Sequence, residues 1–262
     1  MKLGNIVIFT STSNQIGKSF IVKNLAMNLA EEGKKILILD FTETEKDYLE
    51  FFKFNKFNDL SKVFLNELSL QTVKLIYPEN RGISIIKNKE SIKFNEDFIQ
   101  NFLKKIRKTY DYIFIEETNN QNMKEIAKFA NKNIIITNQK TASKSKISSI
   151  KSKRKEIKEH LIILNQFDFD IKNKQEKLLS LEELFKIIDT KLVGVLEHTS
   201  ENTIKKPTTE IPHSNINLAF KRISKRIIEE KHIENIENIE FNNNFSMEIL
   251  YKKFDITEKK SF

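Results

Sequence analysis

The sequence predicts an α/β fold, with a mostly parallel sheet and helices on both of its faces. Short continuous apolar runs alternate along the chain with amphipathic segments of helical spacing. Buried parallel strands have such continuous runs, because helices cover both faces of the sheet. The chain has 262 residues, which is enough for one sizeable domain. We expect a nucleotide-binding domain over residues 1–232, and a linker with an amphipathic tail over residues 233–262.

The first forty residues predict a βαβ unit. Residues 5–10 contain the apolar run of a buried strand, and residues 35–40 contain a second run that ends in Asp40. Between them a helical face is predicted from apolar residues at positions i, i+3, i+4 and i+7, namely Val22, Leu25, Ala26 and Leu29. Gly33 follows this face, where a left-handed residue commonly ends a helix.

The same alternation continues to residue 229. Further strands are predicted at residues 83–86, 111–116, 133–137, 161–165 and 192–196. Further helices are predicted at residues 94–108, 123–131, 142–159, 181–188 and 218–229. Repeated βα units of this kind predict parallel strands joined by crossover helices.

The segment between the first strand and the first helix, residues 10–19, predicts a phosphate-binding loop. The P-loop pattern is G-x-x-x-x-G-K-[ST] between a strand and a helix, and its second half is intact here as Gly17, Lys18 and Ser19. Thr12 stands at the position of the first glycine. The candidate cofactor-binding residues of the loop and helix start are Asn14, Gln15, Ile16, Gly17, Lys18, Ser19 and Phe20.

The chemistry of this loop predicts a nucleotide with β- and γ-phosphates, together with Mg²⁺. Lys18 would reach the β- and γ-phosphates, and Ser19 would place its hydroxyl on Mg²⁺. Asp40 ends a neighbouring strand at the same edge of the sheet, where it could hold a water molecule of the Mg²⁺ shell. Ser19 and Asp40 are therefore the candidate metal residues.

Composition excludes several classes of protein. There are no cysteines, so disulfides and thiolate metal sites are excluded. No apolar run has the length of a membrane span, and we expect a cytoplasmic protein. The formal net charge of +9 is compatible with an acidic lipid or nucleic-acid surface. A lysine-rich run over residues 140–158 could contact DNA phosphates, although a solvated helix face is the favoured explanation.

The tail predicts a short amphipathic helix over residues 245–254. Its apolar residues have helical spacing and lie beside two lysines, in the order Met247, Leu250, Tyr251, Lys252, Lys253 and Phe254. A basic amphipathic helix can bind a membrane surface, so the protein could be peripheral on the inner face of the cell membrane. Packing of this helix on its own domain or on a second chain remains an open alternative.

Residues 2–230 resemble the MinD/ParA family of deviant P-loop ATPases. The resemblance rests on the loop, on Asp40, on Glu116 at the end of a strand, and on Asn165 after the run LIIL. The MinD-like branch is expected ahead of the FlhG-like branch, since the chain starts at its first strand. The resemblance implies an ATP-dependent homodimer that regulates cell division or flagellar placement and that responds to a protein regulator.

The resemblance also implies roles for individual residues. Lys18, Asp40 and Glu116 would be the catalytic residues, with Asp40 in switch I and Glu116 in the Walker B position. Asn165 would recognise adenine. Residues 245–254 stand where the MinD-like proteins have a membrane-targeting helix.

Several positions depart from the family pattern. Ser13 replaces the lysine that crosses to the partner's phosphates, and Asn14 and Gln15 replace two glycines. Thr42 replaces the acid that orients the attacking water, and Glu116 replaces an aspartate. Loss of a trans cation alone can cost about 10³-fold in rate, so we expect ATP binding with weak or absent hydrolysis. A non-catalytic scaffold that binds protein partners and a ParA-like DNA-associated protein remain alternative functions.

Overall fold

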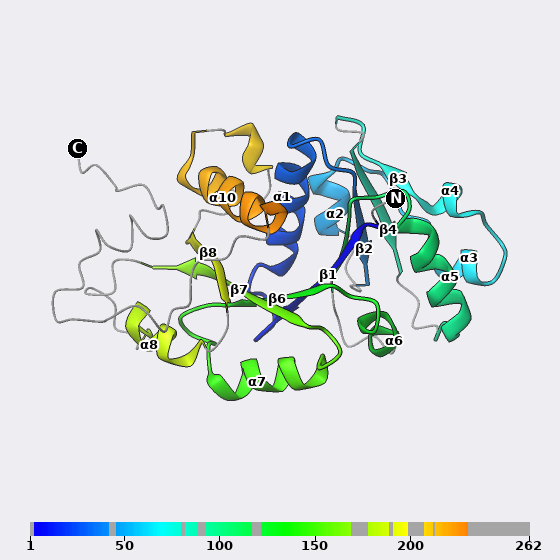
Figure 1. Ribbon diagram of the computed structural model, residues 1–262. Helices are drawn as coiled ribbons and strands as arrows, with labels where there is room; N and C mark the ends of the chain where they lie inside the picture. Colours follow the sequence, from blue (N-terminus) through cyan, green and yellow to red (C-terminus); the bar gives the residue numbers. More distant parts are fainter. Residues whose placement is uncertain are drawn as a thin grey trace.

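The computed structural model describes residues 3–41, 46–79, 82–88, 93–116, 122–168, 178–188, 191–198, 207–211 and 213–229 (Figure 1). The predicted linker and tail, residues 233–262, lie outside these ranges, as do Thr42 and the membrane-helix candidate at residues 245–254. None of the helices in the described ranges is long and apolar enough to cross a membrane.

Within the described ranges, eight strands form one sheet in the order β3-β4-β2-β5-β1-β6-β7-β8. Seven are parallel to their neighbours, and β3 is an antiparallel edge strand on β4. Their bounds are β1 Asn5–Ser11, β2 Ile36–Asp40, β3 Leu75–Ile76, β4 Ile83–Lys87, β5 Tyr112–Glu116, β6 Lys132–Thr137, β7 Glu159–Phe167 and β8 Lys191–Glu197. The predicted parallel α/β sheet is confirmed.

Helices cover both faces of this sheet, as predicted (Figure 1). One face carries α1 Lys18–Glu31, α2 Lys46–Phe51 and α10 Asn215–Glu229. The other face carries α3 Ser61–Phe64, α5 Glu96–Ile106, α6 Met123–Ala127, α7 Lys144–Lys153 and α8 Leu181–Ile187. The short α4 Leu70–Val73 and the 3₁₀ turn η2 Thr208–Glu210 complete the described helices.

The strands alternate between these two layers. In β1, Val7 and Phe9 pack toward α1, whereas Ile6 and Ile8 pack toward the face of α5 and α6, and all four side chains are fully buried. The sequences of such strands are continuous apolar runs, because neither face of the sheet is exposed to solvent. This burial explains why the central strands could be located from the sequence within one or two residues.

Helix α1 is buried on more of its surface than its sequence pattern predicted. Every residue from Phe20 to Ala30 is buried, because α1 lies between the sheet and α10. The rings of Phe20 and Phe220 meet edge to face with centroids 5.6 Å apart. The buried polar residue Asn24 accepts a hydrogen bond from the backbone N–H of Thr208 at 2.7 Å.

The observed elements differ from the predicted ones in several places. The predicted helix at residues 142–159 ends at Lys153, because β7 already begins at Glu159, where it pairs with β6. The sequence analysis also missed the antiparallel strand β3 and the short helices α2, α3 and α4. These helices have four to six residues, which is too short for a clear helical period.

We predict that Gly194→Ala destabilises the protein by about 1–3 kcal/mol, because the added methyl group overpacks the core. A Cβ atom at residue 194 would lie 2.4 Å from Cγ1 of Ile223 on α10. Urea denaturation measures the free energy of unfolding.

The matched background is Ile223→Ala, which removes the obstructing atoms. Adding Gly194→Ala to that background should cost less than it costs in the parent protein, since contacting residues are not additive. Equal costs in the two backgrounds would contradict the proposed clash.

Candidate nucleotide site

Parallel pairing brings the predicted site residues to one edge of the sheet. Asp40 and Glu116 are the last residues of β2 and β5, and they are register partners. Glu116 is also level with Phe9 near the end of β1, which runs directly into the loop. Ligands of open α/β sheets bind at this carboxyl edge.

The first half of the loop is held by hydroxyl groups instead of glycines. The Thr12 hydroxyl lies 2.9 Å from the hydroxyls of both Thr137 and Thr141. The Thr12 backbone N–H donates to the carbonyl oxygen of Ile136 at 3.0 Å, and the Ser11 hydroxyl donates to the carbonyl oxygen of Ser13 at 2.9 Å. These bonds fasten the loop to the end of β6, so a side chain at the first glycine position is accommodated.

The second half of the loop contains backbone strain. Gln15 has a φ of 56° and Gly17 has a φ of 80°, so both are left-handed. This conformation is free for glycine, but it costs a residue with a Cβ atom roughly 1–2 kcal/mol. The expected strain at the missing glycines therefore falls on Gln15, and the loop keeps a left-handed turn despite its sequence.

Asn165 holds the loop from the neighbouring strand β7. Its side-chain Nδ2 donates to the carbonyl oxygen of Ile16 at 2.7 Å, and the side chain is buried. A Cβ atom at Gly17 would lie 2.4 Å from the same Nδ2, so this close approach requires glycine in addition to the positive φ. Recognition of adenine by Asn165 stays a prediction, and the contact to the loop is a role that sequence reasoning missed.

The loop residues differ in what they could offer a ligand. Asn14 and Gln15 are exposed, whereas the side chains of Ile16 and Phe20 are buried in the hydrophobic core on the α1 side of the sheet. Ile16 and Phe20 could therefore contact a phosphate only through their backbone groups. Helix α1 begins at Lys18, and the backbone N–H groups of its first turn are those that a helix cannot satisfy internally.

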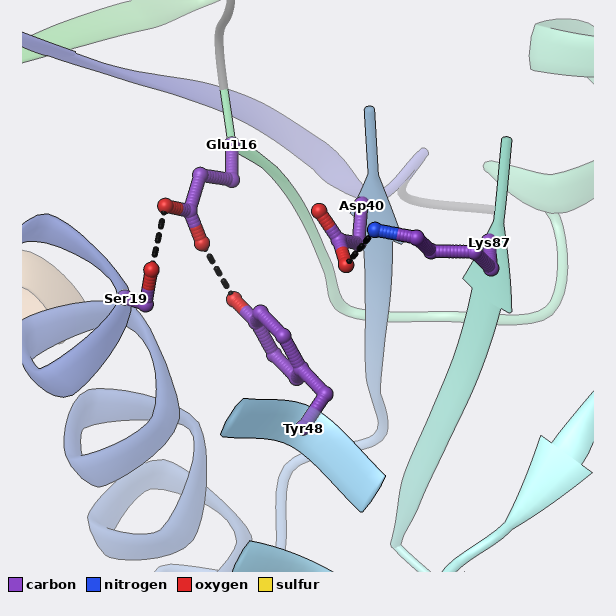
Figure 2. Close-up of polar contacts among 5 residues, drawn as sticks. All are labelled: Ser19, Asp40, Tyr48, Lys87 and Glu116. Atoms are coloured by element: carbon purple, nitrogen blue, oxygen red, sulfur yellow. Dashed lines mark hydrogen bonds and ion pairs between the residues drawn. The ribbon is translucent and has the colours of Figure 1, made fainter. Parts of the chain in front are cut away.

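Glu116 is a buried carboxylate with two hydroxyl donors (Figure 2). The Ser19 hydroxyl donates to its Oε1 at 2.6 Å, and the Tyr48 hydroxyl on α2 donates to its Oε2 at 2.6 Å. Burial and the nearby charge of Asp40 raise the pKa of Glu116, while the charge of Lys18 opposes this shift. Tyr48 was missed by the sequence analysis, because α2 has no clear periodicity.

Asp40 forms a buried ion pair with Lys87 at the end of β4 (Figure 2). Nζ of Lys87 lies 2.7 Å from Oδ2 of Asp40, and both side chains are fully buried. The two residues are register partners on adjacent strands. Sequence reasoning missed Lys87, although a charged residue directly after the apolar run of residues 83–86 was the same signal that identified Asp40.

The site fits the phosphates of a nucleotide better than it fits the predicted Mg²⁺. The left-handed loop, the start of α1 and Lys18 supply the donors that a phosphate chain needs. Ser19 could leave Glu116 by rotation of its hydroxyl group. Asp40, however, would have to give up its buried cation before it could serve a hydrated Mg²⁺ ion. Of the two residues predicted to serve Mg²⁺, Ser19 could therefore do so, whereas Asp40 is already paired with Lys87.

Comparison with models of known protein families finds no match. The chain is 23% identical over 256 residues to the septum site-determining protein MinD of Helicobacter pylori, covering 90% of this chain and 93% of that protein. It is 27% identical over 118 residues to the tyrosine-protein kinase ptk of Acinetobacter johnsonii, but this match spans only 16% of the kinase's length.

Solved structures resemble the whole described domain. The MinC:MinD cell division protein complex of Aquifex aeolicus matches with a TM-score of 0.75 and 15% identity, covering 87% of this chain and 97% of that chain. MinD of Pyrococcus horikoshii complexed with Mg-ADP matches with a TM-score of 0.69 and 19% identity, covering 86% and 96%. A ParA family ATPase of Chlorobium tepidum matches with a TM-score of 0.68 and 15% identity, covering 87% and 100%. The resemblance stated from the sequence is confirmed at the level of the fold: this chain has the fold of the MinD and ParA-family ATPases.

Proposed function

We propose that this protein binds ATP and acts as a MinD-like spatial regulator, of cell division or of flagellar placement. The observation that carries the proposal is the left-handed loop ending in Gly17 and Lys18, which opens α1 at the carboxyl edge of the parallel sheet. The similarity to MinD over 90% of the chain supports the same function. We also propose that Asn165 recognises the adenine base.

Weak or absent ATP hydrolysis is the second part of the proposal. Ser13 carries no charge toward a partner's phosphates, and Glu116 is enclosed by two hydroxyl groups and by the core. Phosphoryl transfer depends on positioned charge, and both of these features reduce it. Asp40 is not proposed as a Mg²⁺ residue, because Lys87 already pairs with its carboxylate.

The partners proposed for this chain are based on those of the similar MinD proteins. MinD of Aquifex aeolicus has been solved with MinC, so we propose that this chain also responds to a protein regulator and forms a homodimer on ATP binding. Peripheral membrane association through residues 245–254 is proposed from the amphipathic sequence pattern alone. The competing scaffold function predicts no nucleotide binding, so a titration with ATP separates the scaffold from the nucleotide-dependent regulator.

A DNA-associated function is the second candidate. It is favoured by the basic segment on α7 and the turn after it, where Lys144, Lys146, Lys153, Lys155 and Lys158 are exposed. A salt-dependent shift of non-specific duplex DNA would support it, since phosphate contacts weaken with salt.

We predict that the parent protein binds ATP in the presence of excess Mg²⁺, and that Lys18→Ala weakens binding by about 10–100-fold. The variant loses a charge-assisted hydrogen bond to the phosphates, which is worth roughly 1.5–3 kcal/mol. Isothermal titration calorimetry gives both dissociation constants, and phosphate release should stay near background.

The matched control is Lys104→Ala, which removes an exposed lysine from α5 on the sheet face opposite α1. Its affinity for ATP should equal that of the parent. Absence of binding by the parent itself would overturn the proposed function.

We predict that Glu116→Gln changes how stability depends on pH. The raised pKa means that the folded protein holds this proton at pH values where the unfolded chain, with an ordinary pKa of about 4.3, has lost it. The parent therefore loses stability as pH rises from about 4 through the folded-state pKa, and the variant lacks this loss. The difference in unfolding free energy should move in favour of the variant by about 1.4 kcal/mol per unit of pKa shift.

Urea denaturation of the nucleotide-free protein between about pH 4.5 and 8 measures this difference in the range where the native state persists. Glu31→Gln makes the same substitution on an exposed side chain and serves as the control. A difference for Glu116→Gln that is independent of pH would refute the assignment of a raised pKa.

We predict that removal of residues 245–262 abolishes binding to anionic lipid vesicles. The amphipathic stripe supplies apolar contact and its lysines supply charge. Co-sedimentation with vesicles measures binding. A full-length Leu250→Glu variant should lose binding in the same way, and unchanged sedimentation of both variants would eliminate the membrane helix.

A further inference from the structure

The ion pair between Asp40 and Lys87 places an ammonium group inside the candidate site. The 2.7 Å contact joins the ends of β2 and β4, and neither side chain is exposed to solvent. Figure 2 shows the Lys87 side chain crossing from its own strand to the carboxylate of Asp40. The ammonium therefore occupies the side of Asp40 that faces β4.

The backbone around this pair is also held in place. The Asn88 backbone N–H donates to the carbonyl oxygen of Asp40 at 2.8 Å, and the Leu60 N–H donates to the carbonyl oxygen of Lys87 at 2.8 Å. Separating two buried charges in a medium of low polarity is strongly unfavourable. The pair should therefore persist when a nucleotide binds.

Charge balance at the sheet edge differs as a result from that of an ordinary Mg²⁺ site. Among the described residues, Lys87 neutralises Asp40, and the charge of Lys18 acts on Glu116. Asp40 is therefore neutralised by an ammonium group of the chain itself. A lysine beside Asp40 also repels a hydrated Mg²⁺ ion from that carboxylate.

We propose that Lys87 stands in for the charge of Mg²⁺ beside Asp40, so that this site binds nucleoside triphosphates with an affinity that depends little on Mg²⁺. This inference rests on the proposed function, because it concerns the same site. The loop backbone and Lys18 hold the phosphates, and Lys87 is a positioning residue that keeps Asp40 neutralised.

The test compares ATP affinity with excess Mg²⁺ and with EDTA by isothermal titration calorimetry. For the parent we expect dissociation constants that differ by less than about threefold. Lys87→Met frees Asp40 for the hydrated ion, so its ratio of the two constants should be at least about tenfold larger than that of the parent. Lys104→Met on the surface of α5 is the matched control and should behave like the parent.

The double variant Asp40→Asn/Lys87→Met tests the pair without leaving a buried charge, in case Lys87→Met alone does not fold. It should bind ATP with the parent's weak dependence on Mg²⁺, because the carboxylate is absent. Binding by the parent that requires Mg²⁺ would overturn the inference and leave the proposed function intact. Absence of ATP binding under both conditions would overturn both.

Discussion

Parallel pairing of β1, β2, β4 and β5 is the constraint on which the rest of the structure depends. In a parallel sheet the strands all end at the same edge, so whatever follows or ends each strand is brought together there. Asp40, Lys87 and Glu116 are last residues of their strands and stand in direct register. The loop at the end of β1 meets the same edge, and the site is therefore a consequence of the sheet.

Burial at this edge requires that each charge has a partner. Asp40 has an ammonium group beside it, and Glu116 accepts hydrogen bonds from two hydroxyls while its burial raises its pKa. A metal ion could neutralise both acids, but here the chain supplies its own compensation. Asp40 is consequently neutralised without a divalent ion.

The loop shows how a phosphate-binding geometry survives the loss of glycines. Thr12 replaces a glycine and gains two hydroxyl neighbours, while Gln15 accepts an unfavourable left-handed backbone. Asn165 ties the loop to β7 through the carbonyl oxygen of Ile16, beside Gly17, where an added Cβ atom would collide with the Asn165 amide. Contacts from β6 and β7 thus replace part of the conformational freedom that glycines would provide.

The sequence by itself determined which segments form buried strands, where the loop lies and that Asp40 and Glu116 end their strands, because apolar runs and a tripeptide after a strand are local signals. Only the tertiary structure decided that Lys87 pairs with Asp40, that the Tyr48 hydroxyl donates to Glu116 and that Asn165 holds the loop. Each of these contacts joins residues at least 47 positions apart, and their elements lie in an order that the sheet's crossovers set. Local pattern carries no information about such neighbours, since the crossover order of the sheet creates them.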